Sequence, residues 1–170
     1  MGRVERLFVL LGLSPGVLHT VLCAWRRRGL IGDDTRVILL ATRRDAAEKA
    51  VEVAARCPCP GEERAPLRDP GLVEVRLLER GDYDSVGAVR ELRSVLVELG
   101  VGPGDGVDVT GGRKLASVEV ALFAAQRGAL VGYSLIPSSE YQRLQGRGEE
   151  GDVCESMTSR IPPELIAPLP

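Results

Sequence analysis

The chain has 170 residues, of which 44% are hydrophobic and 27% are charged, and its formal net charge is −2. This composition is ordinary for a globular domain and excludes a wholly disordered chain. Because the chain has no overall positive charge, it is not expected to carry a general DNA- or RNA-binding surface.

The apolar runs of the sequence are too short to span a bilayer. The first run has Arg3, Glu5 and Arg6 in or beside it, and no cleavage site follows it, so it does not resemble a signal peptide. We therefore expect a cytoplasmic protein without DNA or membrane partners.

The choice of basic and amide residues is unusual. The sequence contains no Asn, and only Lys49 and Lys114 are lysines among its 22 basic residues. A scarcity of heat-labile amides is typical of thermophilic proteins, while GC-rich coding bias would give the same excess of Arg. With either explanation, a lysine is a rare residue in this chain, so its position is informative.

Strand and helix patterns alternate along the chain. Short apolar segments predict five strands, at residues 7–13, 36–42, 72–78, 106–110 and 129–136. Segments with helical patterns predict four helices between them, at residues 17–28, 44–56, 84–99 and 113–127. The Pro-rich segment from residue 137 has no sustained pattern, and one short helix or an added edge strand is expected there.

This alternation predicts an α/β fold. We expect a Rossmann-like, mostly parallel sheet of five or six strands with helices on both faces. Residues 1–137 are assigned to this domain, and residues 138–170 to a partly ordered, Pro-rich C-terminal extension.

The strand order of such a sheet indicates where a ligand binds. Ligands bind outside the carboxyl ends of the strands, at the point where the strand order reverses. In the order 3-2-1-4-5, the first and fourth strands flank this point, and a glycine-rich turn follows each of them. The residues of these two turns are the candidate site: Gly12, Leu13, Ser14, Pro15, Gly16, Thr110, Gly111, Gly112, Arg113 and Lys114.

The second turn has an unfavourable placement of charge. Gly111 and Gly112 would let a ligand approach backbone N–H groups at a helix N-terminus. Arg113 and Lys114 add two cations where the helix dipole is already positive. A bound anion would explain this arrangement; a tight turn with two solvated cations is the alternative.

In the first turn, Ser14 is expected to cap the following helix, with Pro15 at its first position. This capping role does not exclude a ligand-binding role for the Ser14 hydroxyl. Neither turn has the glycine spacing of standard dinucleotide or nucleoside-triphosphate sites.

The four cysteines lack the spacing of a structural zinc site, and no metal or cofactor is expected. Cys23 is predicted to be a core residue. A disulfide between Cys57 and Cys59 is conceivable but would be strained. The single histidine, His19, lies in the first helix, where packing or surface exposure is more common than acid–base chemistry.

Two acidic residues flank the fourth strand. Asp108 is expected to face the polar edge of the ligand crevice rather than to bind metal. Asp105, at the start of the same strand, and Asp108 would both be reconsidered as metal ligands only if the activity depended on a divalent ion.

The sequences Gly-Leu-Ser-Pro-Gly and Asp-Val-Thr-Gly-Gly-Arg-Lys in these two turns resemble the CRISPR-associated Rossmann-like (CARF) family. The resemblance is closest to archaeal stand-alone ring nucleases that degrade cyclic tetra-adenylate, and it extends over about residues 7–137. It implies a homodimer that binds a cyclic oligoadenylate across its two-fold axis.

The resemblance also implies a reaction. The ring would be opened without metal, through attack of a ribose 2′-hydroxyl, leaving a 2′,3′-cyclic phosphate and ending type III CRISPR antiviral signalling. Ser14 would orient the ligand, and Lys114, with Arg113, would stabilise the charged phosphorane. The other turn residues would bind the ligand.

The charges agree with this reading. Arg113 and Lys114 give +2 per chain and hence +4 per dimer, which matches the four phosphodiesters of a cyclic tetranucleotide. The C-terminal segment is too short for the winged helix of related regulators or for an added nuclease domain, so ring cleavage is the simplest activity. The alternatives are a non-catalytic sensor or sponge, a regulator without its DNA-binding domain, and an unrelated Rossmann-like nucleotide-binding protein.

Overall fold

The computed structural model describes residues 2–80, 83, 85–145 and 151–167. One six-stranded sheet with the order β3-β2-β1-β4-β5-β6 forms its centre. The strands are β1 (Arg6–Leu11), β2 (Arg36–Ala41), β3 (Val73–Leu77), β4 (Asp105–Asp108), β5 (Leu130–Leu135) and β6 (Glu164–Ile166). The helices are α1 (Gly16–Arg27), α2 (Arg44–Arg56), the 3-10 turn η1 (Pro70–Leu72), α3 (Val86–Glu98), α4 (Lys114–Gln126), α5 (Ser138–Leu144) and α6 (Val153–Met157).

The predicted α/β fold and strand order are confirmed. β1 to β5 are parallel to their neighbours, and β6 is added antiparallel to β5 at the sheet edge. The central strands β1 and β2 are almost wholly buried, as expected for parallel strands covered on both faces.

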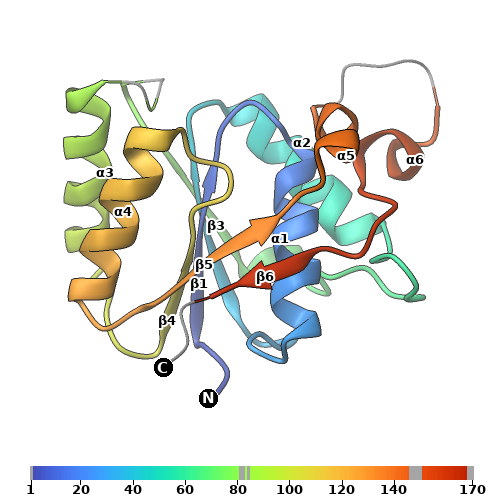
Figure 1. Ribbon diagram of the computed structural model, residues 1–170, viewed down its shortest axis with the longest axis horizontal. Coiled ribbons are helices and arrows are strands. Elements are labelled where there is room, and N and C mark those ends of the chain that lie inside the picture. The colour runs from blue at the N-terminus through green and yellow to red at the C-terminus, as the bar shows by residue number, and fades with distance from the viewer. Residues whose placement is uncertain (1, 81–82, 84, 146–150, 168–170) are drawn as a thin grey trace.

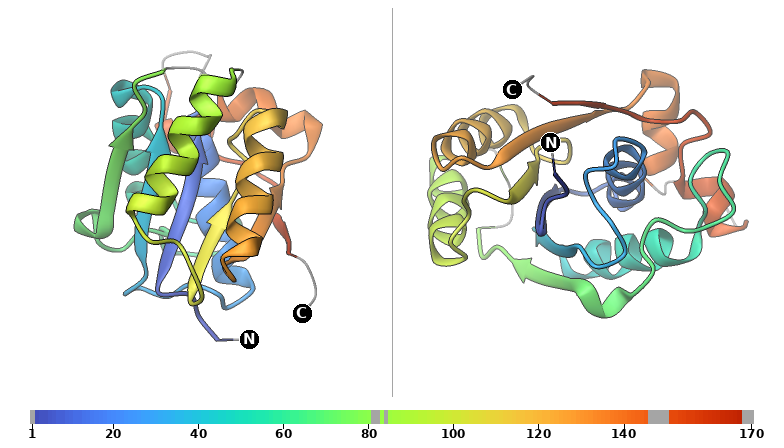
Figure 2. Two further views of the ribbon diagram at one scale, coloured as in Figure 1. Left: turned by 90° about the vertical axis from the view of Figure 1, so that its left-hand side faces the viewer. Right: turned by 90° about the horizontal axis from the view of Figure 1, so that it is seen from below.

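Helices cover both faces of the sheet, α1 and α2 on one side and α3 and α4 on the other (Figure 1 and Figure 2). Each pair packs on the sheet over its own hydrophobic cluster. Trp25, from α1, belongs to the first cluster, and Phe123, from α4, belongs to the second. None of the helices in the described part of the chain is long and apolar enough to cross a membrane.

The later part of the chain folds back onto the α1 side. A Cβ atom on Gly16, the first residue of α1, would lie 2.3 Å from the carbonyl oxygen of Met157 and 2.9 Å from Cα of Leu144. The segment that contains α5 and α6 therefore packs directly on the start of α1, and only glycine fits at this contact.

Cys23 is buried in the core, as predicted, but the conceivable disulfide between Cys57 and Cys59 does not form. Cys23 of α1 forms a disulfide with Cys59, and Cys57 forms one with Cys154 of α6. The loop after α2 runs past α1 and α6, so its two neighbouring cysteines reach different partners. A pattern of residues near in sequence cannot show such long-range pairings.

Candidate functional site

The two glycine-rich turns meet at the carboxyl end of the sheet. β1 and β4 are adjacent strands, so the turns that follow them lie side by side. A Cβ atom on Gly111 would lie 1.9 Å from the carbonyl oxygen of Leu10, and one on Gly12 would lie 3.1 Å from that of Gly111. The two backbones are therefore in contact, and no larger residue fits at position 111.

A cleft of about 540 Å³ opens at these turns, within the size range of small-molecule sites. Seven of the predicted residues line it: Gly12, Leu13, Ser14, Gly111, Gly112, Arg113 and Lys114. The structure thus brings the two proposed catalytic residues, Ser14 and Lys114, to one cleft although they are 100 positions apart in the sequence.

The other three predicted residues lie behind the cleft. Pro15 and Gly16 are buried in the turn and at the start of α1. Thr110 is buried, and its Oγ1 accepts a hydrogen bond from the backbone N–H of Ser134 at 2.7 Å. These residues shape the turns without lining the cleft.

Ser14 does not cap α1, contrary to the sequence prediction. The helix begins at Gly16, its N-cap residue is Pro15, and no side chain caps it. The Ser14 hydroxyl makes no hydrogen bond to any described residue, whereas its carbonyl accepts one from Val17. The hydroxyl is therefore available to a ligand.

Positive charge gathers at the start of α4. Lys114 is the first residue of this helix and Arg113 its N-cap, and the first turn contains no acidic residue. Both side chains are exposed. Ser117 links the helix start to the residue that follows β4, because its Oγ donates to the carbonyl oxygen of Val109 at 2.9 Å. The cations, together with the N–H groups of the first turn, make this end of the cleft a site for an anion.

A comparison of the sequence with known proteins gives one decisive relative. Over 146 residues the chain is 30% identical to the CRISPR system ring nuclease SSO2081 of Saccharolobus solfataricus. The match covers 85% of this chain and 79% of the relative. The chain belongs to the CRISPR ring nuclease family, of the CARF type. No protein-family model matches it.

In this ring nuclease family member, buried Asp108 holds the second glycine-rich turn in place through hydrogen bonds. Its carboxylate accepts hydrogen bonds from Trp25 Nε1 at 2.7 Å, Ser134 Oγ at 2.8 Å and the Thr110 N–H at 2.9 Å. Burial raises the pKa of Asp108, and these three donors oppose the rise. The expectation that Asp108 faces the edge of the crevice is wrong, because Asp108 is fully buried and its carboxylate accepts hydrogen bonds from Trp25 and Ser134 inside the fold.

Asp105 is also remote from the cleft. It lies at the opposite end of β4, where it pairs with Arg6 at 2.7 Å and accepts the backbone N–H of Gly102. The hydrogen bonds that Arg6 donates to the Asp105 carboxylate raise the pKa of Arg6. These contacts make Asp105 a structural residue.

Five further residues line the cleft that the sequence reasoning missed: Val17, Thr42, Tyr83, Tyr141 and Gln145. The Tyr83 hydroxyl donates to the carbonyl oxygen of Leu40 at 2.7 Å, and burial raises its pKa. Tyr83 is thus a fixed wall rather than an acid or a base. Tyr141 and Gln145 come from α5 and its C-cap position, where the sequence showed no sustained pattern.

His19 does not line the cleft. It is buried in α1, and its Nε2 lies 2.9 Å from the carbonyl oxygen of Cys57. Burial lowers the pKa of His19 and so favours its neutral form. A packing role agrees with the sequence prediction and excludes direct acid–base chemistry in the cleft.

Proposed function

We propose that the chain is a metal-independent ring nuclease that binds cyclic tetra-adenylate at a homodimer cleft and cleaves it to linear products with 2′,3′-cyclic phosphate ends. The observation that carries this proposal is the meeting of Ser14 and Lys114 at one cleft, in a chain 30% identical to a CRISPR ring nuclease. The cleavage would end type III CRISPR antiviral signalling.

The reaction needs orientation and charge stabilisation more than proton transfer. The 2′-oxygen of a ribose forms a bond to its own 3′-phosphorus, and the bond from phosphorus to the next 5′-oxygen breaks. Lys114, Arg113 and the N–H groups of α4 would stabilise the phosphorane, while the Ser14 hydroxyl would hold the ribose or phosphate in line.

The composition of the cleft supports this mechanism. The described residues that line it include no His, Asp or Glu, and Tyr83 is held by backbone carbonyls. The attacking 2′-hydroxyl gives its proton to water, and the leaving 5′-oxygen takes a proton from water. Two cations per chain and positioned donors are the chemical means that this cleft offers.

A homodimer would complete the site. A ring with four-fold symmetry also has a two-fold axis, so each protomer can present the same two turns to it. Leu115, Val118 and Leu122 form an exposed apolar stripe along α4 that begins beside Lys114. A second copy packed on this stripe would bring four cations to the four phosphates and bury the apolar side chains.

The test is incubation of the protein with radiolabelled cyclic tetra-adenylate in EDTA, followed by identification of the ends of the products. Linear fragments with 2′,3′-cyclic phosphate ends are expected, and a 2′-deoxy ring should bind but remain intact. Binding should weaken as salt is raised, because phosphate contacts are screened. Retention without cleavage would identify a sensor instead. Activity that requires Mg²⁺ or Mn²⁺, or products with only 5′-phosphate ends, would overturn the mechanism.

A further inference from the structure

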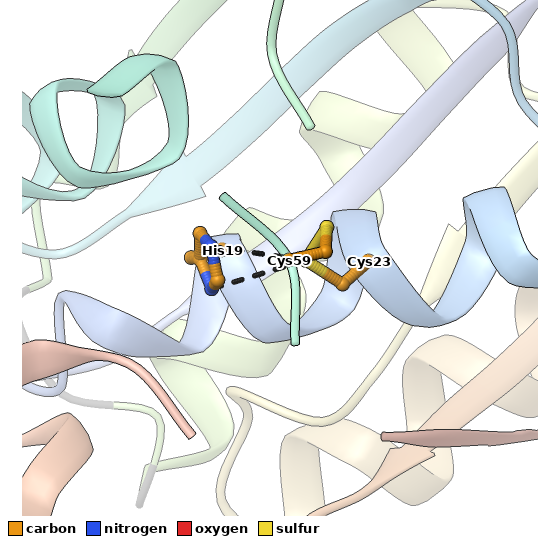
Figure 3. A group of neighbouring side chains, drawn as sticks. All are labelled: His19, Cys23 and Cys59. Atoms are coloured by element: carbon orange, nitrogen blue, oxygen red, sulfur yellow. Dashed lines mark hydrogen bonds between the residues drawn. A yellow bond between two sulfur atoms is a disulfide. The ribbon is translucent and has the colours of Figure 1, made fainter. Parts of the chain in front are cut away.

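A second cluster of reactive side chains lies outside the cleft (Figure 3). His19 and Cys23 are one turn apart on α1, and Cys59 reaches them from the loop after α2. One ligand atom from each of the three residues lies within 4.8 Å of the others. The residues are 1%, 0% and 2% exposed, respectively, and none of them lines the cleft.

The imidazole of His19 is oriented by two backbone carbonyls. Its Nε2 lies 2.9 Å from the oxygen of Cys57 and 3.1 Å from that of Pro58. Carbonyl oxygens only accept hydrogen bonds, so Nε2 carries the ring proton and Nδ1 carries a lone pair. Metal-binding histidines are held in this way, with the second ring nitrogen donating to a carbonyl.

Both ring nitrogens of His19 lie close to sulfur. Cys23 Sγ lies 3.9 Å from Nδ1 and 3.8 Å from Nε2, and it is bonded to Cys59 Sγ. A disulfide sulfur has no proton, so it cannot donate a hydrogen bond to Nδ1. The Nδ1 lone pair therefore receives no proton from the disulfide, and it is available to a metal ion.

We propose that, after reduction of the Cys23–Cys59 disulfide, His19, Cys23 and Cys59 bind a zinc ion. A dithiol reductant supplies two electrons and two protons, becomes a disulfide itself and leaves two cysteine thiols. Zinc then displaces the two thiol protons and is held by two thiolates and His19 Nδ1. Water completes the tetrahedron, as in other zinc sites with three protein ligands.

The geometry requires only a local adjustment. Zn–S and Zn–N bonds of about 2.3 and about 2.0–2.1 Å place tetrahedral ligand atoms roughly 3.3–3.8 Å apart. The 3.9 Å between Nδ1 and Cys23 Sγ is already close to this separation. The two sulfur atoms must move apart, and Cys59 can do so because it lies on a loop.

The ligand spacing explains why the sequence did not indicate this site. Two ligands lie four residues apart on a helix and the third follows 36 positions after Cys23, which matches no pair of closely spaced zinc ligands. In either redox state the loop after α2 would be linked to α1, by a disulfide when oxidised and by zinc when reduced. Most cytoplasms keep thiols reduced, whereas hyperthermophiles retain intracellular disulfides.

The test titrates the whole, anaerobically reduced protein with Zn²⁺ in competition with a chromophoric chelator. We expect one tightly bound Zn²⁺ per reduced chain and none in the oxidised protein. Co²⁺ in place of Zn²⁺ should give thiolate charge-transfer bands and the intense visible bands of a tetrahedral site.

Three variants separate this site from other thiols. His19→Ala and Cys59→Ser should each weaken Zn²⁺ binding by more than the roughly 10–100-fold typical of an outer-shell change. Cys154→Ser removes a thiol outside the cluster and should bind Zn²⁺ as the wild type does. Because His19→Ala keeps both cysteines, its fold can be checked in the oxidised state by circular dichroism. No stoichiometric Zn²⁺ in the reduced wild type, or equal binding by His19→Ala, would overturn the proposal.

Discussion

Of the two lysines of the chain, one lines the cleft and the other lies outside it, so the second can serve as a control when the first is mutated. Lys114 lies at the cleft and the start of α4, whereas Lys49 lies on α2 and pairs with Glu52 at 3.0 Å. Lys114→Ala should lower the single-turnover rate of ring cleavage by on the order of 10²–10³, the usual cost of losing one charge-stabilising donor. Lys49→Ala should cleave normally. A near wild-type rate for Lys114→Ala would remove Lys114 from the mechanism.

Ser14 allows function to be separated from stability. Because its side chain does not cap α1, Ser14→Ala should leave the free energy of unfolding unchanged, where loss of a capping serine would cost about 1 kcal/mol. Ring cleavage should nevertheless slow, because the ligand loses an orienting hydroxyl. Urea unfolding and single-turnover kinetics measure the two effects. A stability loss with normal cleavage would reverse this assignment.

At the scale of elements, the contact between the two turns depends on Gly111. Gly111→Ala would place a Cβ atom 1.9 Å from the carbonyl oxygen of Leu10, so the ends of β1 and β4 would have to separate. We expect a loss of roughly 1–3 kcal/mol in the free energy of unfolding, typical of overpacking.

Gly102→Ala is the control for this substitution. A Cβ atom there would meet nothing closer than the carbonyl oxygen of Arg127, at 3.7 Å. Its unfolding should therefore stay within about 0.5 kcal/mol of the wild type. Equal urea midpoints for the two variants would contradict the close approach of the turns.

The sequence predicted the strands, helices and turns that are marked by patterns of residues close together in the chain. The alternation of apolar strands with helical patterns predicted the α/β fold and its strand order. The glycines after β1 and β4 then predicted where the cleft lies. The start of α1 was predicted to within one residue, but its N-cap was predicted wrongly, because Pro15 rather than Ser14 occupies that position. The disulfides and the cleft residues Tyr141 and Gln145 depend on contacts between distant segments, which one sequence does not reveal.

At the scale of the whole molecule, the proposed dimer makes a distinct prediction. Leu122 is 58% exposed on the apolar stripe of α4, so Leu122→Glu would place a charge in the interface. It should shift the protein toward monomer in light scattering and slow ring cleavage, while the circular dichroism spectrum stays unchanged.

Val97, on α3, is the corresponding control because it is 53% exposed and lies outside the stripe. Val97→Glu should keep both the oligomeric state and the activity. A wild-type protein that is strictly monomeric at micromolar concentration with ligand present would remove the dimer from the proposed function.

The cleft takes its walls from distant parts of the chain, and this has a consequence for biosynthesis. Leu13 and Ser14 leave the ribosome early, whereas Tyr141 and Gln145 follow only after all five parallel strands. A nascent chain can therefore assemble the sheet and both glycine-rich turns while one wall of the cleft is still missing. Ligand capture by the finished cleft has to wait for α5, so translation itself sets the earliest moment at which a new molecule can act on its ligand.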